Sequence, residues 1–385
     1  MKADDLYPEK QLLRRKTLVQ AEKLDRYIGV RRVWDRRLVF RTLHDVNNPK
    51  SVHGIYPYRG KISAIDARQI IDQLPTEGTL LDPFCGSGTI VYEAREHGIN
   101  AIGVDNNPIA VTIAKGKLEK NDLRSLMERA RTLIDRARSL REVSPMPKSP
   151  SRYFHLETAD QIMRLAQLAR KNEMSDFELA CFFGSICLAA RGCNHYVWSS
   201  TNTGKIFLPH RRIDFYDKFL GKVKKHHNLS TSKAQAQIYL HDSRNLSDIL
   251  PEKSIDFVLT SPPYFDALDY TSYYTRIVYE IMEYDRAEIR SRLIQNFNRY
   301  EEDMRLALEE IDKITKDDAI IVFVVGDKKI RGRVIGGGEF FLQISSHKPT
   351  CVLERSYSGT ASKIWDSINK TQRKEQIVVW DKKEY

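Results

Sequence analysis

Short apolar runs alternate with amphipathic segments in two separate stretches of the chain. Runs of strand length lie at residues 79–82, 101–105, 238–242, 255–260, 319–326 and 375–380. Helical patterns fill residues 63–74, 90–97, a segment that begins near Pro108, and residues 270–284 and 286–315. Strands that alternate with helices in this way predict an α/β fold with a mainly parallel sheet.

The middle of the chain breaks this alternation. Residues 118–141 are charged and helical, 144–150 contain three prolines that would end a helix, and 157–190 fit two helices, the second apolar enough to be buried. From 191 to 235 the periodicity is lost and basic and aromatic residues increase. We therefore expect an extension with an amphipathic helix (1–50), a first α/β half (51–117), a largely helical insertion (118–235) and a second α/β half (236–385).

Composition narrows the class of protein. Of the 385 residues, 41% are hydrophobic and 29% are charged, and no apolar run approaches the roughly 20 residues of a membrane span. The chain also opens without an apolar signal core, so we expect no membrane association and a cytoplasmic location. Its five cysteines show neither CxxC pairs nor zinc-site spacing, which predicts free thiols and no metal. The net charge of +11 favours a polyanionic partner.

The turn after the first strand contains the first candidate chemistry. Gly86 and Gly88 would let the backbone approach a ligand where a Cβ would clash, and would leave the first amides of the next helix free. Asp105 ends the second strand about 20 residues later, where a carboxylate can accept both hydroxyls of a ribose. Asp242 ends the third strand and could reach an adenine amino group. The full GxGxxG of a dinucleotide site and the Gly-Lys-Ser/Thr of a phosphate loop do not occur here, so a nucleoside ligand without phosphates fits better.

Two stretches resemble a known family. Residues from Asp82 to Thr89 read Asp-Pro-Phe-Cys-Gly-Ser-Gly-Thr, and residues from Thr260 to Tyr264 read Thr-Ser-Pro-Pro-Tyr. They look like motifs I and IV of the S-adenosylmethionine-dependent DNA amino-methyltransferases, which modify cytosine N4 or adenine N6. The resemblance implies a Rossmann-like class I methyltransferase with a mainly parallel seven-stranded sheet and a largely helical insertion. Its cofactor would be S-adenosylmethionine.

The same resemblance implies the cofactor-binding residues. The segment Tyr-Pro-Tyr-Arg-Gly-Lys that contains Tyr58 is similar to the family element that helps to hold the methionine end of the donor. With motif I and the strand ends, the expected set is Tyr58, Asp82, Pro83, Phe84, Gly86, Gly88, Thr89, Asp105, Asn106 and Asp242.

The second motif indicates the chemistry. An exocyclic amino nitrogen is a poor nucleophile because its lone pair is delocalised into the ring, so positioning must dominate catalysis. Pro262 and Pro263 would stiffen the loop, and the Ser261 hydroxyl and the Pro262 carbonyl could accept hydrogen bonds from the amino group. The Tyr264 ring could stack on a base that has been flipped out of a duplex. No covalent intermediate is required, and we expect Cys85 to be a space-filling residue.

The acceptor is less narrowly defined. Ser-Pro-Pro-Tyr, in place of Asn-Pro-Pro-Tyr, favours cytosine N4 in double-stranded DNA over adenine N6, although cytosine-N4 enzymes often carry the two motifs in the opposite order. A transfer RNA guanine-N2 methyltransferase is a further alternative, which the serine in place of aspartate disfavours. We expect the modification enzyme of a restriction-modification system, with a separate endonuclease as its partner. Lys222 and other basic residues of 191–235 could contact phosphates, with Arg211, Arg212, Lys224 and Lys225 the leading candidates.

Overall fold

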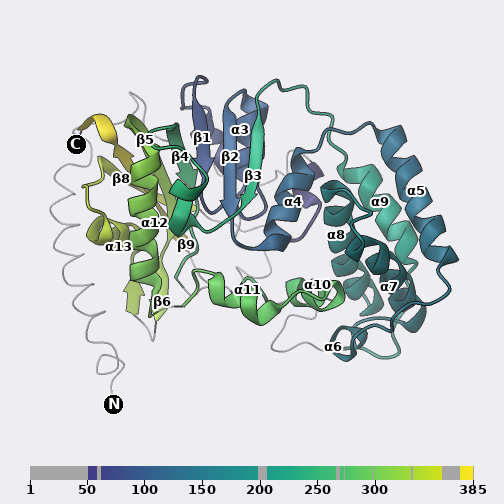
Figure 1. Cartoon of the computed structure of the whole chain (residues 1–385). Helices are drawn as coiled ribbons and strands as arrows, with labels where there is room; N and C mark the ends of the chain where they lie inside the picture. The colour runs from purple at the N-terminus through teal and green to yellow at the C-terminus, as the bar shows by residue number, and fades with distance from the viewer. Residues whose placement is uncertain are drawn as a thin grey trace, which may run out of the picture.

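The computed structural model describes residues 51–58, 62–197, 206–265, 269–272, 274–296, 298–330, 333–357 and 373–384. The predicted extension at 1–50 lies outside the described residues. Within them, a twisted sheet on one side of the molecule adjoins a group of helices on the other (Figure 1). The first described element is a short 3-10 helix, η1 (Ser51–Gly54), and the last is η3 (Lys382–Glu384).

Seven strands form the main sheet, in the order β3-β2-β1-β4-β5-β9-β8. Their bounds are β1 Thr79–Asp82, β2 Asn100–Asp105, β3 Ala236–Leu240, β4 Ile255–Thr260, β5 Thr315–Gly326, β8 Cys351–Tyr357 and β9 Arg373–Asp381. The first five pair in parallel, whereas β9 runs antiparallel to β5 and β8. This is the Rossmann-like methyltransferase fold, so the predicted fold class is confirmed. The strand order reverses between β1 and β4, where ligands bind in open α/β sheets.

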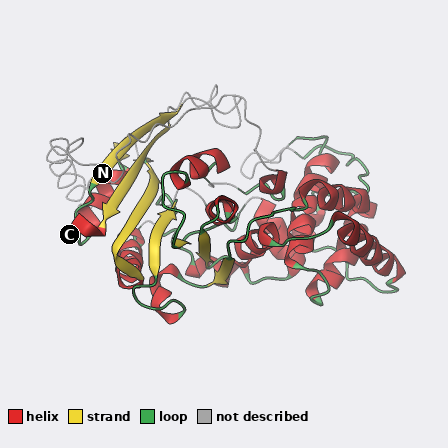
Figure 2. Ribbon diagram, turned by 90° about the horizontal axis from the view of Figure 1, so that it is seen from above, coloured by secondary structure: helices red, strands yellow, loops and turns green. Residues whose placement is uncertain are grey.

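Helices cover both faces of the sheet (Figure 2). One face packs against α2 (Ala64–Ile71), α3 (Thr89–His97) and α4 (Pro108–Leu118), and the other against η2 (Ser243–Asp248), α12 (Tyr300–Ile314) and α13 (Gly337–Ile344). Successive strand residues point to opposite faces, so Leu80 belongs to the first apolar core and Leu81 to the second. This two-sided burial explains why the strands read as continuous apolar runs.

The described helices between residues 123 and 226 form a body beside the sheet. It comprises α5 (Leu123–Ser139), α6 (Lys148–Ser151), α7 (Leu156–Arg170), α8 (Asp176–Cys193) and α9 (Phe215–His226), and it packs with α10 (Tyr274–Met282) around its own apolar core. Helix α9 lies in the segment 191–235, where the sequence showed no periodicity and no helix was predicted. Its buried Phe215, Phe219 and Val223 are spaced by four residues, but charged neighbours hide this pattern in the sequence.

The structure corrects the element predictions in further places. Residues 286–315, expected as one helix, form α11 (Arg286–Arg292) and α12, because Leu293 leaves the helical conformation and the Asn296 side chain accepts a bond from the amide of Asn298. Strand β8 and the hairpin of β6 (Lys328–Ile330) and β7 (Arg333–Ile335) were not predicted. Strand β3 ends at Leu240, so Asp242 follows the strand by two residues.

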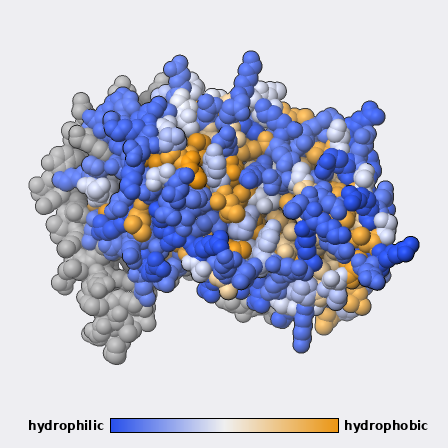
Figure 3. Space-filling view, viewed as in Figure 1, coloured by the Kyte–Doolittle hydropathy of each residue, from blue (hydrophilic) through white to orange (hydrophobic). Residues whose placement is uncertain are grey.

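The surface shown in Figure 3 is mainly hydrophilic, with apolar residues in separate patches. Among the described residues, no helix is both long enough and apolar enough to cross a membrane.

Candidate functional site

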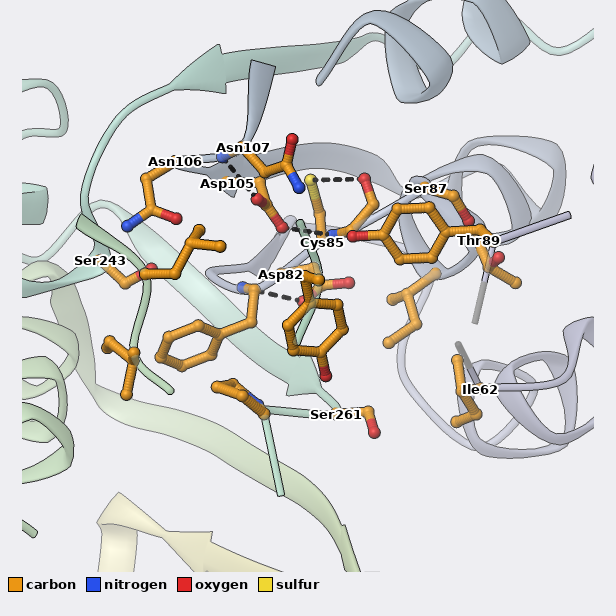
Figure 4. Close-up of a pocket in the computed structure, with 18 residues that line it drawn as sticks. Ile62, Asp82, Cys85, Ser87, Thr89, Asp105, Asn106, Asn107, Ser243 and Ser261 are labelled. Atoms are coloured by element: carbon orange, nitrogen blue, oxygen red, sulfur yellow. Dashed lines mark hydrogen bonds between the residues drawn. The ribbon is translucent and has the colours of Figure 1, made fainter. Parts of the chain in front are cut away.

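A cavity lies at the carboxyl ends of β1, β2 and β4, where the strand order reverses (Figure 4). It encloses about 760 Å³ of space, including part of the open solvent at its mouth. The residues predicted for the site that line it are Tyr58, Asp82, Phe84, Gly86, Thr89, Asp105, Asn106, Ser261 and Pro263. The structure thus brings residues from both motifs into one cavity, although they are more than 150 positions apart in the chain.

The two turn glycines have different roles. Gly86 lines the cavity with a φ of 49°, and a Cβ on it would lie 3.1 Å from Cε1 of Tyr58. Gly88 does not line the cavity. With a φ of 69°, its added Cβ would lie 2.7 Å from the Cβ of Ala114 in α4. Gly88 therefore permits close packing between the turn and a helix, rather than the close approach to a ligand that we expected for both glycines.

Asp105 is oriented by the backbone around it. Its Oδ2 accepts the amide of Gly86 at 2.8 Å and its Oδ1 accepts the amide of Asn107 at 2.9 Å. Burial raises the pKa of the carboxyl to about 6, against the two hydrogen bonds, which lower it. The carboxylate is thus held in place by neutral donors at the wall of the cavity.

Asp82 connects β1 to β4. Its Oδ1 accepts the Thr260 hydroxyl at 2.6 Å and the amide of Phe84 at 3.2 Å. Burial raises the pKa of this carboxyl to about 7, although both hydrogen bonds lower it. Nearby, burial also raises the pKa of the Cys85 thiol well above its usual value, so this cysteine stays protonated, as a space-filling residue would.

Two buried polar atoms beside the cavity have no hydrogen-bond partner within the described part of the chain. They are Oγ1 of Thr89 and Nδ2 of Asn107. The carbonyl oxygen of the Asn107 amide accepts the Ile109 amide at 3.0 Å and the Tyr279 hydroxyl at 2.6 Å, which fixes the side chain. Since buried polar groups are almost always bonded, a fixed donor and a hydroxyl in this state indicate a place for a polar ligand. Sequence reasoning missed Asn107 because its Asn-Pro pair reads as an ordinary helix start.

Asp242 is placed differently from the prediction. It does not line the cavity, and its carboxylate binds the guanidinium of Arg244, which also reaches Asp303 at 2.6 Å. Burial raises the pKa of Asp242, but the contacts with Arg244 outweigh it and hold the pKa below its usual value. The adjacent Ser243 lines the cavity instead, and its hydroxyl donates to the carbonyl of Pro83, which is itself outside the lining.

The Ser-Pro-Pro-Tyr loop is only partly exposed to the cavity. Ser261 and Pro263 line it, whereas Pro262 is buried and Tyr264 lies outside the lining. The hydroxyl of Tyr264 is 3.0 Å from that of Ser261 and donates to the carbonyl of Val324 at 3.3 Å. Its ring packs on the end of β5, where a Cβ on Gly326 would lie 2.6 Å from the ring carbon Cδ2.

Three lining residues come from segments that the sequence predicted to be helical but did not assign to the site. The ring of Tyr270 stacks near that of Tyr58, with centroids 6.5 Å apart and an angle of 25° between the planes. Leu293 and Ile294 come from the connection between α11 and α12, which was expected to be helical. No periodicity in the sequence marks these positions as close to the glycine turn.

The four predicted DNA-contact residues do not form one surface. Arg211 lies 4.7 Å above the ring of Tyr196, and Arg212 pairs with Glu157 at 2.5 Å. Lys224 and Lys225 are exposed at the other end of α9, about 18 Å along a helix of this length. After that end, Asn228 donates to a carbonyl in the last turn of α4 and Ser232 to one in the last turn of α3. These helices end at the edge of the sheet opposite the cavity.

The model of the D12 class N6 adenine-specific DNA methyltransferase family matches residues 64–323, more than half of the chain. The chain belongs to this family. Membership confirms the expected DNA amino-methyltransferase family, but the family description names adenine N6 and does not support the preference for cytosine N4.

Similar proteins include the type II methyltransferase M.MjaII of Methanocaldococcus jannaschii, 36% identical over 30% of this chain and 21% of that protein. The type II methyltransferase M.MvaI of Kocuria varians is 23% identical over 50% of this chain and 48% of its own. The chain thus matches less than half the length of either relative. Among solved structures, the rRNA methyltransferase aviRa of Streptomyces viridochromogenes aligns with a TM-score of 0.36 and 14% identity, over 90% of this chain and 96% of its own.

S-adenosylmethionine is the cofactor of this D12 class chain. The cavity fits such a molecule, because Asp105 offers a carboxylate to hydroxyls while Thr89 and Asn107 offer polar atoms that lack partners. In the described part of the chain, no group of three or more histidine, cysteine, aspartate or glutamate residues could hold a metal ion.

Proposed function

We propose that this D12 class protein transfers a methyl group from S-adenosylmethionine to an exocyclic amino group of a base in double-stranded DNA. The observation that carries the proposal is that Asp105, from the donor half, and Ser261, from the catalytic half, line the same cavity. The cofactor supplies a methyl group on a positively charged sulfur. The nitrogen–methyl bond forms as the sulfur–methyl bond breaks, and the amino nitrogen then releases one proton.

Adenine N6 is the acceptor that the family description favours. Cytosine N4 is the second candidate, and Ser261 at the first position of the catalytic motif favours it. The test is mass spectrometry of nucleosides from DNA of a host that expresses the protein, with RNA from the same cells as a control. N6-methyladenine supports the first candidate and N4-methylcytosine the second. DNA with neither, beside methylated guanine in RNA, would overturn the proposal.

The donor is held by residues at the three strand ends. We assign the ribose hydroxyls to the carboxylate of Asp105, and the ammonium at the methionine end to Asp82 and the Tyr58 segment. Thr89 and Asn106 complete the polar wall, and Phe84 supplies apolar contact. Asp242 has no direct role here, because Arg244 occupies its carboxylate.

The acceptor amino group is held by the Ser-Pro-Pro-Tyr loop. The Ser261 hydroxyl and the Pro262 carbonyl accept its hydrogen bonds, and Pro263 limits the motion of the loop. The Tyr264 ring stacks on the flipped base, and the missing Cβ of Gly326 leaves room for the ring at the end of β5. Replacing Tyr264 by alanine should abolish methyl transfer and leave cofactor affinity near normal. Full activity in this variant would contradict the mechanism.

The DNA contact is assigned to the end of the insertion that carries Arg211. The neighbouring His210 ring bonds the carbonyl of Arg152, next to α6. Helix α6 packs on α10, which begins four residues after the cavity residue Tyr270, so this end lies on the cavity side of the molecule. Arg211→Ala should lower the slope of log affinity for DNA against log salt by about one unit. Lys225→Ala, at the far end of α9, is the matched control with a smaller expected change. Equal changes would contradict the assignment.

The similar proteins, which are type II methyltransferases, support a proposal for the biological setting. We propose that the protein is the modification enzyme of a restriction-modification system and acts beside a separate endonuclease. DNA from expressing cells should resist one endonuclease that cuts the same sequence in unmodified DNA. Sensitivity to every endonuclease tested, in DNA shown to be methylated, would argue for a methyltransferase that acts without such a partner.

A further inference from the structure

The segment that carries Tyr58 is built into the helical insertion. Ile55 and Tyr56 belong to the apolar core of the insertion helices. Other members of this core are Phe183 of α8 and Phe219 of α9. This core is separate from the two cores of the sheet. The insertion therefore supports the segment that supplies Tyr58 to the cavity, while the lining residues themselves lie outside 118–235.

The backbone of this segment lies directly on α8. A Cβ added to Gly184 would come within 1.9 Å of the carbonyl oxygen of Ile55 and 3.0 Å of Cε of Lys222. Only a glycine permits this approach, so the backbone near Ile55 is positioned by a specific contact with the insertion.

Lys222 of α9 bonds the backbone at the same point. Its side chain is buried, with 6% of the residue exposed, and Nζ donates to the carbonyls of Gly54 at 3.0 Å and Ile55 at 2.8 Å. A buried ammonium is costly unless its donors are bonded, and charge-assisted bonds are among the stronger ones. These contacts hold the residues directly before Tyr56 in one position.

The constraint extends along the chain to the cavity. The hydroxyl of Tyr56 donates to Oγ1 of Thr275 at 3.2 Å, and the amide of Tyr58 donates to the carbonyl of Tyr56 at 2.8 Å. The Tyr58 ring then lies between Gly86 of the glycine turn and the ring of Tyr270. Tyr58, whose side chain lines the cavity, is three positions after Ile55, whose carbonyl is held by Lys222.

We propose that Lys222 is a positioning residue for the methyl donor, which holds the 54–58 segment so that Tyr58 faces the cofactor. The inference rests on the proposed function, because it takes this cavity as the donor site. It assigns to Lys222 a structural bond in place of the phosphate contact that the basic sequence around it suggested.

The experiment measures S-adenosylmethionine affinity by calorimetry for the full chain and for Lys222→Met, which keeps the unbranched stem and removes the ammonium. The dissociation constant should rise about tenfold, as expected when a buried charge-assisted bond is lost. Lys218→Met, the same change one turn earlier on α9, is the control and should behave as the wild type. The milder Lys222→Gln, with a neutral donor of shorter reach, should raise the constant by about threefold and serves if Lys222→Met folds poorly.

A double-mutant cycle separates positioning from general destabilisation. In a Tyr58→Ala background, Lys222→Met should have little further effect on donor affinity, because the residue through which it acts is missing. An equal loss in both backgrounds, or unchanged affinity in Lys222→Met and Lys222→Gln, would overturn the inference while leaving the proposed function intact. Failure of the wild type to bind the donor would overturn both.

Discussion

The carboxyl ends of β2 and β3 are neighbours in the sheet. Asp105 is the last residue of β2 and Asp242 follows β3 by two residues, yet the two carboxylates differ. Asp105 lines the cavity and accepts bonds from neutral backbone amides. Asp242 is outside the lining and is bound to Arg244, which also bonds Asp303. The carboxylate at a strand end is available to a ligand in the case of Asp105, whereas at Asp242 it is already paired with an arginine of the protein.

The same difference is visible in the protonation of the two groups. Burial raises the pKa of Asp105 to about 6, whereas Arg244 offsets the burial of Asp242 and lowers its pKa. In the protein without ligand, Asp105 thus retains an unfavourable buried charge that a donor hydroxyl can stabilise. This contrast between the two carboxylates should appear in the affinity for S-adenosylmethionine.

The largest effect is expected for Asp105→Ala. This change removes two charge-assisted bonds to the ribose and the acceptor of the Gly86 and Asn107 amides, so the dissociation constant should rise by about 100-fold or more. Calorimetry measures it, with unfolding in urea as a check that the variant is folded. A rise below about threefold would show that the ribose is held elsewhere.

Acidification should weaken donor binding next most strongly. Ribose hydroxyls need the ionised carboxylate, and the pKa of Asp105 is raised to about 6. Affinity should therefore be nearly constant above about pH 7 and fall about tenfold by about pH 5. Stability of the ligand-free protein should respond in the opposite sense. Because the pKa of Asp105 is higher in the folded state, its protonation stabilises the folded state when the pH is below the pKa of the unfolded chain. This contribution is lost as the pH rises through about 6.

The control for the pH experiment is Asp105→Asn, which is similar in shape but does not titrate. Its weaker affinity should vary little between about pH 5 and pH 7. A pH dependence that persists in this variant would assign the titration to another group, with Asp82 the first candidate because burial raises its pKa to about 7.

A smaller effect is expected for Ser243→Ala. Its hydroxyl lines the cavity and donates to the carbonyl of Pro83, so its loss should relax the start of the glycine turn and raise the dissociation constant by about threefold. Ser247→Ala, on the same 3-10 helix but bonded to Glu310 away from the cavity, is the matched control. A larger change in the control than in Ser243→Ala would refute the assignment.

The smallest effect on affinity, within about twofold, is expected for Asp242→Ala, because its carboxylate does not line the cavity. Stability should change more, since the half-buried Arg244 loses one of its two carboxylates, at a cost of about 1–3 kcal/mol in the free energy of unfolding. Urea denaturation measures this. A loss of affinity as large as that in Asp105→Ala would restore the direct role that the sequence predicted.

How much of the site could be predicted depends on how local its determinants are. The turn from Asp82 to Thr89 and the Ser-Pro-Pro-Tyr loop were found because short runs of glycine or proline restrict the backbone strongly. Asn107 and Tyr270 were not found, because the packing of a helix or a loop brings each of them to the cavity and no periodic pattern in the sequence predicts that packing. The break between α11 and α12 was missed for a similar reason, since a side-chain bond at Asn296 overrides a helical pattern.

The sequence by itself determined the strand and helix alternation, the strand-end acids and the two motifs, because hydrophobic periodicity and special backbone residues act over a few positions. Only the tertiary structure decided which acid faces the cavity and which basic residues face water. Arg244 closes on Asp242, and Lys222 turns inward to bond Gly54 and Ile55. Arg244 is also bonded by Asp303, and Lys222 is bonded by carbonyls more than 160 positions earlier in the chain, so both outcomes depend on contacts between residues that only folding brings together.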